Sequence, residues 1–211
     1  MQLDILRVWF EHNGDFFLTG GGALCGFYGL PRATSDLDLF TVVADAYSRA
    51  GDLIHDCCQI LGLEFEALVT SRHFRRYRLH RGDEVTLVDL VEDLAPQVFP
   101  EKSLVAGKFK IDPAEEIAVN KVCAIVSRSE PRDFYDLYYL TTQGQDPDLA
   151  LQRANQKDGG VTAETLVMML REIDWERFQI PGIDVADTAR FFVSWLERLT
   201  LGFYPGEPPP Y

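Results

Sequence analysis

Three consecutive glycines, residues 20–22, separate a short apolar segment from an alternating segment that carries two aspartates. The apolar segment, 16–19, and the alternating segment, 36–43, are each typical of a β-strand, and the glycines predict a turn that opens a short helix. Side chains two residues apart on a strand point to the same face of the sheet, so Asp36 and Asp38 are expected to project together. This order of elements constrains the N-terminal half to a mixed α/β arrangement.

The aspartate pair predicts a metal site. Two adjacent carboxylates repel each other unless a cation lies between them, and Mg²⁺ is commonly held by one or two carboxylates together with substrate phosphates. A glycine turn that opens a helix offers backbone N–H groups to a phosphate, and Thr34 and Ser35 directly precede the first aspartate. The alternative is an exposed acidic pair at the start of a strand. Together, the motifs indicate metal-dependent handling of a nucleoside triphosphate.

A third acid, Asp89, interrupts an otherwise apolar strand over 85–91. An acid inside a buried strand is costly unless it is paired or bound to a metal. If this strand neighbours segment 36–43, the three carboxylates can bind two Mg²⁺ ions about 3.5–4 Å apart. The alternative is that Asp89 faces solvent at the end of its strand.

Segment 72–81 is dense in positive charge within a chain whose net charge is −13. The net charge argues against a protein held to nucleic acid by bulk electrostatics, but a strand from Arg72 to Arg81 can contact RNA or phosphate locally. The alternative is an edge strand whose charges prevent aggregation. The acidic remainder of the chain suits a basic protein partner.

Helical patterns dominate after residue 112. We predict an α+β fold, in which a mixed sheet flanked by helices (residues 1–112) is followed by an all-α domain (residues 113–211). The expected strands are 16–19, 36–43, 64–70, 75–80 and 85–91, with a hairpin turn at Gly82-Asp83. The expected helices are 2–12, 20–29, a helix capped by Asp45 and running to 61, 113–126, 131–140, 147–156, 162–171 and 184–200, followed by an extended tail over 206–211.

The first two of these C-terminal helices carry an unusual set of charges. Lys121 lies inside an apolar stretch and shares a helix stripe with Arg128, while Arg132 and Asp136 form an i, i+4 pair beside Asp133. A buried lysine can reach phosphates as a point charge. The alternative is a salt-bridge network that docks the two helices.

The location of the protein is predicted from what the sequence lacks. No apolar run approaches the roughly 18 residues of a membrane span, and the N-terminus shows no basic region followed by an apolar one. The four cysteines have neither CxxC spacing nor a paired pattern. They are expected to be free thiols in a reducing cytosol, without a zinc site, so the chain is predicted to be cytoplasmic and not membrane-bound.

In their order along the chain, these blocks resemble the AbiEii-type nucleotidyltransferases. This family is a branch of the DNA polymerase β-like superfamily and includes the MenT-type toxins of bacterial toxin–antitoxin systems. The resemblance covers roughly residues 16–140, and the matching blocks are Leu18–Leu24, Arg32–Leu39, the strand of Asp89, and the helical set Glu116, Asn120, Lys121, Ala124, Arg128, Pro131, Arg132, Asp133, Asp136 and Leu137. The superfamily opens its helix with a Gly-Ser pair, whereas here the three glycines leave the serine contact to Thr19 or Ser35.

The resemblance implies a nucleotidyltransferase palm over 1–112 and a helical domain over 113–211 that completes the active-site cleft. It implies transfer of a nucleoside monophosphate from an NTP to an acceptor, with release of pyrophosphate. The expected catalytic residues are Asp36, Asp38, Asp89, Lys121 and Asp133, and the expected Mg²⁺ ligands are Asp36, Asp38 and Asp89. The expected nucleotide-binding residues are Gly20, Gly21, Thr34, Ser35, Lys121, Arg132 and Asp136.

Three functions remain in competition at this point. The first is a toxin that modifies RNA at the 3′ end of tRNA and is countered by an antitoxin protein. The second keeps the chemistry but uses a small-molecule or protein acceptor and is not a toxin, and the acidic surface favours it because an acidic cleft attracts cationic acceptors. The third is a non-catalytic interaction protein on a decayed palm, against which the intact acids argue.

Overall fold

The computed structural model describes residues 1–203, which fold into two compact units. Unit 1 comprises Met1–Ala95 and Phe99–Ile117, and unit 2 comprises Pro96–Val98 and the chain from Ala118 onward. The tail expected over 206–211 lies outside the described residues. Within residues 1–203, no helix combines the length and the apolar character that crossing a membrane requires.

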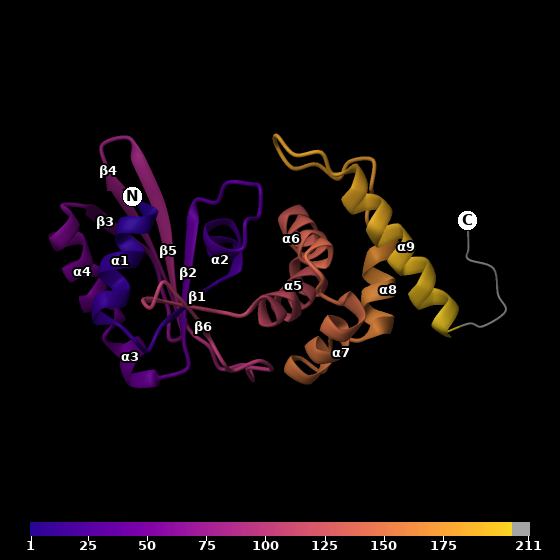
Figure 1. Ribbon diagram of the computed structural model, residues 1–211, viewed down its shortest axis with the longest axis horizontal. Coiled ribbons are helices and arrows are strands. Elements are labelled where there is room, and N and C mark those ends of the chain that lie inside the picture. The colour runs from indigo at the N-terminus through magenta and orange to yellow at the C-terminus, as the bar shows by residue number, and fades with distance from the viewer. Residues whose placement is uncertain (204–211) are drawn as a thin grey trace. The chain divides into compact units, whose positions relative to one another are not determined.

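Unit 1 is built on a seven-stranded sheet with the order β3-β4-β5-β2-β1-β7-β6 (Figure 1). The pairs β2/β5 and β1/β7 are parallel and the other neighbours are antiparallel, so the sheet is mixed. The strands are β1 (Phe17–Thr19), β2 (Asp36–Thr41), β3 (Glu64–Thr70), β4 (Phe74–Arg81), β5 (Glu84–Glu92), β6 (Ser103–Val105) and β7 (Phe109–Ile111).

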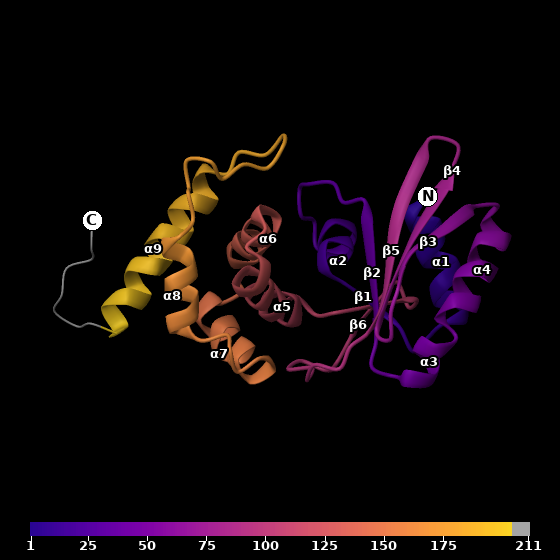
Figure 2. The ribbon, with the colours of Figure 1, turned by 180° about the vertical axis from the view of Figure 1, so that it is seen from behind.

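Three of the helices of unit 1 cover one face of this sheet, as Figures 1 and 2 show from opposite sides. These are α1 (Gln2–His12), α3 (Ala44–Ser48) and α4 (Ala50–Leu61), whereas α2 (Gly20–Phe27) follows β1 directly and packs against β1 and β2. Strand β2 alternates strictly, with Leu37 and Leu39 buried and Asp36 and Asp38 partly exposed. The aspartates therefore point away from the apolar face on which the core forms.

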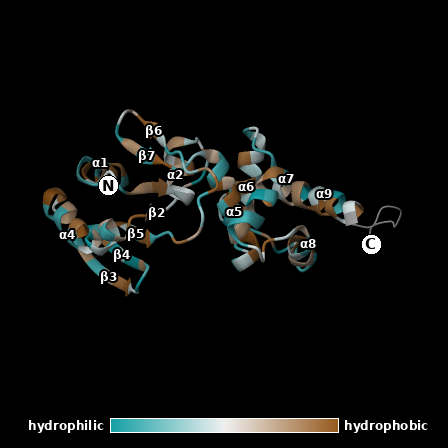
Figure 3. Ribbon diagram, turned by 90° about the horizontal axis from the view of Figure 1, so that it is seen from below, coloured by the Kyte–Doolittle hydropathy of each residue, from teal (hydrophilic) through white to brown (hydrophobic). Residues whose placement is uncertain are grey.

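Unit 2 consists of helices around an aromatic core. The rings of Trp175, Phe178 and Phe192 lie within 6 Å of the ring of Phe134, which is fully buried. Figure 3 shows hydrophilic and hydrophobic residues interleaved along the helices, as expected where one stripe of each helix faces the core. The helices from residue 114 onward are α5 (Ala114–Arg128), α6 (Pro131–Thr142), α7 (Pro147–Lys157), α8 (Ala163–Arg171) and α9 (Ala186–Phe203).

The predicted α+β class is confirmed, and the hairpin turn at residues 82–83 joins β4 to β5 as expected. The single helix expected over 45–61 is wrong, because the chain forms α3 and α4 with a break at Arg49. The side chains of Ser48 and Arg49 both bond the carbonyl oxygen of Asp45, which competes with the helical hydrogen-bond pattern. Asp45 is not the N-cap either, because α3 begins at Ala44.

Two buried thiols on α4 give a testable prediction for unit 1. Burial raises the pKa of Cys57 to about 12 and that of Cys58 to about 11. Because the thiolate is the reactive form, we expect both to resist alkylation by iodoacetamide at pH 8 in the native protein, while the partly exposed Cys25 and Cys123 react first. Mass-spectrometric mapping of the labelled positions tests this, and early labelling at Cys57 or Cys58 would contradict it.

Candidate active site

A row of polar side chains crosses the centre of the sheet of unit 1. Asp38 on β2 lies directly beside Asp89 on β5, because the two strands are parallel neighbours in this register. On its other side, Asp38 is paired with Thr19 of β1. Directly paired residues share a face, and Asp36 lies two positions before Asp38 on the same strand. The three acids that the sequence predicts as metal ligands therefore occupy one face of the sheet.

Arg76 extends this row from β4, where it is paired with Asp89. Its Nε and Nη2 atoms each donate a hydrogen bond of 2.7 Å, to Oδ1 and Oδ2 of Asp89 respectively. Hydrogen bonding to Asp89 raises the pKa of Arg76, and the charges of Asp89, Asp36 and Asp38 raise it further, against the opposing effect of partial burial. The carboxylate of Asp89 is 8 % exposed and the side chain of Arg76 is 38 % exposed, so the acid is buried while the arginine remains in contact with solvent.

The acids supply hard oxygen donors, which is the donor type that Mg²⁺ prefers. Among residues 1–203, no group of three or more His, Cys, Asp or Glu side chains is assembled in a geometry that could hold a metal ion. In the structure, both oxygens of Asp89 accept hydrogen bonds from the guanidinium of Arg76. The three acids fit Mg²⁺ by donor type, whereas their arrangement here pairs Asp89 with Arg76.

The glycine turn lies against the same row. Gly20 adopts a left-handed conformation with φ of +59°, and a Cβ built on it would lie 2.5 Å from Oδ2 of Asp38. A Cβ on Gly21 would lie 3.0 Å from Nη2 of Arg32 and 3.4 Å from Oγ1 of Thr34. The turn therefore brings its backbone close to one predicted metal ligand and to the segment that precedes β2.

The residues just before β2 orient its first acid. The hydroxyl of Ser35 donates a 2.7 Å hydrogen bond to Oδ1 of Asp36, and the N–H of Asp36 donates to Oγ1 of Thr34 at 3.3 Å. The structure thus brings together the predicted residues of unit 1, which are Gly20, Gly21, Thr34, Ser35, Asp36, Asp38 and Asp89.

Replacing Gly20 with alanine is expected to reduce nucleotidyl transfer by about 10²-fold, because the new methyl group displaces the carboxylate of Asp38 and misplacement of about 1 Å costs that much. The strained left-handed backbone costs stability by about 1–2 kcal/mol. Gly26→Ala is the matched control in the same helix, because a Cβ there meets no atom within 4 Å. Transfer rates and melting temperatures of both variants test this, and wild-type activity in Gly20→Ala would contradict it.

The remaining predicted residues belong to unit 2 and form a buried ion-pair network. Nζ of Lys121 on α5 lies 2.7 Å from Oδ1 of Asp133 and 2.6 Å from Oδ2 of Asp136. These two acids are one turn apart on α6, so they face the same neighbour. Arg128 also donates to both oxygens of Asp133, at 2.8 and 3.0 Å. In contrast, the predicted nucleotide-binding residue Arg132 is exposed.

The network keeps its members charged. Burial alone would lower the pKa of Lys121, but the charges of Asp136 and Asp133 raise it above its ordinary value. Burial alone would raise the pKa of Asp133, but hydrogen bonds from Arg128 and the charge of Lys121 hold it below its ordinary value. The sequence allowed Lys121 to be either a phosphate ligand or part of a helix-docking network, and here its ammonium group docks α5 onto α6.

The basic strand predicted to contact RNA is β4 with the residues before it. Most of its positive side chains are paired with acids or rings of unit 1, which reduces the charge that it presents. The contacts are His73 with Glu92, Arg75 over the ring of Tyr47, Arg76 with Asp89, Arg78 with Glu66, His80 with Glu64, and Arg81 with Glu84. RNA contact through Arg72–Arg81 stays a prediction.

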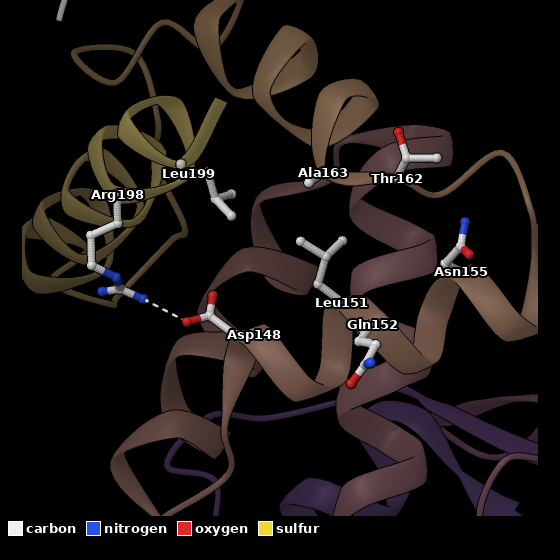
Figure 4. A pocket seen from close by; sticks show the side chains of 9 residues that line it. Asp148, Leu151, Gln152, Asn155, Thr162, Ala163, Arg198 and Leu199 are labelled. Atoms are coloured by element: carbon white, nitrogen blue, oxygen red, sulfur yellow. Dashed lines mark hydrogen bonds and ion pairs between the residues drawn. The ribbon is translucent and has the colours of Figure 1, made fainter. Parts of the chain in front are cut away.

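Two pockets differ in how close they lie to the predicted site residues. One of about 380 Å³ in unit 1 adjoins the glycine turn and includes Gly22, Arg32 and Thr34. A larger one of about 580 Å³ lies in unit 2 between α7, α8 and α9 (Figure 4). No predicted site residue lines the larger pocket, whose walls are Asp148, Leu151, Gln152, Asn155, Thr162, Ala163, Arg198, Leu199 and Gly202.

Sequence reasoning missed Arg76 as a member of the acidic row. The signal was present, because a two-residue turn at 82–83 pairs Arg81 with Glu84, and counting back along both strands places Arg76 opposite Asp89. Arg76 was instead grouped with the other arginines of its strand as a candidate RNA contact.

Comparison with known proteins identifies the family of the chain. The family model described as "Nucleotidyl transferase AbiEii toxin, Type IV TA system" matches residues 4–193. This range includes every predicted site residue of both units. No curated protein sequence is significantly similar to the chain.

Two solved structures, both from Helicobacter pylori, are similar to the chain over nearly its whole length. One is a candidate nucleotidyltransferase with 18 % identity and a TM-score of 0.62, covering 99 % of this chain and 95 % of the other. The second is the protein JHP933, with 20 % identity and a TM-score of 0.59, covering 97 % of this chain and 94 % of the other. At these identities the similarity shows a common fold.

Proposed function

Since the chain belongs to the AbiEii family of nucleotidyltransferase toxins, we propose that it transfers a nucleoside monophosphate from an NTP to the 3′ end of tRNA. The proposed reaction requires Mg²⁺ and releases pyrophosphate. The protein would act in the cytoplasm, where NTPs and tRNA are found, and an antitoxin protein would restrain it.

The register of β2 and β5 carries this proposal. It sets Asp38 and Asp89 side by side, with Asp36 on the same face and with the glycine turn against Asp38. A nucleotidyl-transfer site needs oxygen ligands for a divalent cation next to backbone groups that bind phosphate. In support of this, the three acids of unit 1 supply oxygen donors of the kind that Mg²⁺ prefers, and the glycine turn that opens α2 lies against Asp38.

Each residue has a definite role in the proposed reaction. Asp36, Asp38 and Asp89 would hold Mg²⁺, which when bound would neutralise phosphate charge and polarise the reacting oxygens. The backbone N–H groups at the start of α2 point toward bound phosphates, and Ser35 keeps Asp36 oriented through its hydroxyl. The acceptor hydroxyl loses its proton to solvent, and its oxygen attacks the α-phosphorus. The bond between the α-phosphorus and the oxygen that bridges to the β-phosphate breaks, and that oxygen leaves with pyrophosphate.

The proposed role of Lys121 needs a change in the buried network. A contact between Lys121 and the triphosphate requires its Nζ to leave Asp133 or Asp136, which now hold it at 2.7 and 2.6 Å. Asp133 keeps a partner in that case, because Arg128 bonds both of its oxygens.

The test is transfer of label to RNA by the purified full-length protein. The protein is incubated with Mg²⁺, total tRNA and each of the four α-labelled NTPs in turn, and the RNA is separated on a denaturing gel. We expect label in tRNA with at least one NTP, loss of that label with EDTA, and growth arrest when the protein is expressed alone. Absence of labelled RNA with all four NTPs would overturn the tRNA assignment.

A small-molecule or protein acceptor is the second candidate, and the net charge of −13 favours it. An acidic surface attracts cationic molecules and repels RNA. The same incubation, with amine-bearing small molecules or a cell extract in place of tRNA, distinguishes the two. Labelled small molecule or protein without labelled RNA, together with harmless expression, would support this candidate.

A further inference from the structure

Arg76 bonds both carboxylate oxygens of Asp89, a predicted metal ligand. Its guanidinium bonds both oxygens of Asp89 at 2.7 Å, in the parallel two-pronged arrangement that makes arginine–carboxylate pairs strong. Each oxygen keeps a second lone pair, but the guanidinium charge lies directly against the carboxylate and weakens its attraction for another cation. Arg76 and a divalent ion therefore compete for the negative charge of Asp89.

The charge distribution explains why an arginine is placed there. Asp38 lies beside Asp89 in the sheet register, and both Asp36 and Asp38 act electrostatically on Arg76. Three carboxylates on one face of a sheet repel each other, and this repulsion is greatest when no metal is bound. A guanidinium at the end of the row offsets part of it.

Other arginines of the same strand are placed differently. Arg78, two residues along β4, pairs with Glu66, whose side chain is 60 % exposed. Arg81 pairs with Glu84, which is 58 % exposed. In contrast, Asp89 is 8 % exposed, so Arg76 is the arginine of β4 whose ion pair involves a buried carboxylate, although its own side chain is 38 % exposed.

We propose that Arg76 is a cationic placeholder, which occupies Asp89 in the metal-free protein and is displaced from it when a divalent cation binds. This inference rests on the proposed function, because it takes Asp89 as a metal ligand. It makes Arg76 a positioning residue that sets the affinity for the metal and stabilises the acidic row in its absence. By thermodynamic linkage, a bound metal weakens the Arg76–Asp89 pair as much as that pair weakens the metal.

The test measures metal affinity and metal-free stability without measuring turnover. The full-length protein is freed of metal with EDTA and desalted, and Mn²⁺ is titrated as a paramagnetic probe by electron paramagnetic resonance. We expect Arg76→Gln to bind Mn²⁺ on the order of tenfold more tightly than wild type, because competition for Asp89 is removed. Its melting temperature without metal is expected to fall by about 5 °C or more, because the acids lose their counter-charge.

Two variants serve as references in the same titration. Arg78→Gln removes an arginine from the same strand face and is expected to leave both measurements at wild-type values. Arg76→Lys keeps the charge but loses the two-pronged geometry, so its Mn²⁺ affinity is expected between those of wild type and Arg76→Gln. If Arg76→Gln does not fold, a tighter affinity in Arg76→Lys supports the proposal, and an equal or weaker one overturns it.

Asp38→Asn separates failure of this inference from failure of the proposed function. If Asp38→Asn loses Mn²⁺ binding while Arg76→Gln binds with wild-type or weaker affinity, the placeholder is wrong and the metal site stands. If Asp38→Asn binds Mn²⁺ as wild type does, the metal site is wrong, and the placeholder is overturned with it.

Discussion

Asp38→Asn is expected to lower the rate of nucleotidyl transfer by about 10³-fold or more while leaving the protein folded. Asparagine has nearly the same shape as aspartate but no charge, so the variant keeps the contact with the glycine turn and loses a proposed ligand for Mg²⁺. Removing one charge-stabilising ligand in such a site costs several kcal/mol in the transition state, and each 1.36 kcal/mol is about tenfold in rate.

Stability is expected to change little. Neutralising Asp38 relieves its repulsion with Asp89 and Asp36, but it also removes the attraction between Asp38 and Arg76. The melting temperature of metal-free Asp38→Asn should therefore stay close to that of wild type. A fall in activity with unchanged stability distinguishes loss of a ligand from loss of the fold.

The matched control is Asp83→Asn, which removes the same charge from an exposed position in the turn between β4 and β5. Its transfer rate is expected to remain within about twofold of wild type, since surface substitutions away from a site have small effects. Label incorporation from an α-labelled NTP and thermal unfolding are measured in parallel for both variants. Transfer at the wild-type rate by Asp38→Asn would show that the acidic row is not the catalytic centre.

The alternation of Asp36, Leu37, Asp38 and Leu39 was sufficient to predict both a strand and the face on which its acids lie. That face is correct because the side-chain period of a strand is two and one side is buried. The neighbour of this strand could not be read from the sequence in the same way. β5 joins β2 only after the chain has made β3 and β4, and pairing across such a separation depends on the whole sheet.

The short strands β6 and β7 escaped prediction for a related reason. Each has three residues, too few to show an alternation, and β7 is recognisable only by its pairing with β1 and β6. The break between α3 and α4 was missed because the competing bonds to the carbonyl of Asp45 come from side chains that are unremarkable in a helical pattern. Local pattern thus located the acids, while tertiary pairing decided their neighbours.

The charged residues of α5 and α6 are a second case in which local sequence spacing did not predict the tertiary partners. The sequence placed Arg132 and Asp136 as a pair because they are four residues apart on one helix. The structure instead bonds Asp136 to Lys121, on the other helix, and leaves Arg132 exposed. Helical spacing predicts partners within a helix, whereas burial between helices selects partners across them.

Lys121→Met is expected to destabilise unit 2 by about 3–5 kcal/mol, because it removes the buried cation that Asp133 and Asp136 share. Methionine preserves most of the apolar stem, so the loss arises from charge and not from a cavity. The variant Lys121→Met/Asp136→Asn is expected to recover part of the loss, about 0.5–3 kcal/mol, since it removes one of the buried charges. Asp133 retains Arg128 in both variants.

Arg177→Met is the matched control in the same unit, because Arg177 is 89 % exposed and its ion pair with Asp174 lies at the surface. It is expected to change stability by about 1 kcal/mol or less. Urea unfolding followed by the fluorescence of Trp175 and Trp195, in a Trp9→Phe background, reports unit 2 in all variants. The geometry of the network predicts that Lys121→Met lowers the free energy of unfolding. Wild-type stability in Lys121→Met, together with weakened NTP binding, would contradict this and would show that Lys121 binds the triphosphate instead of packing α5 on α6.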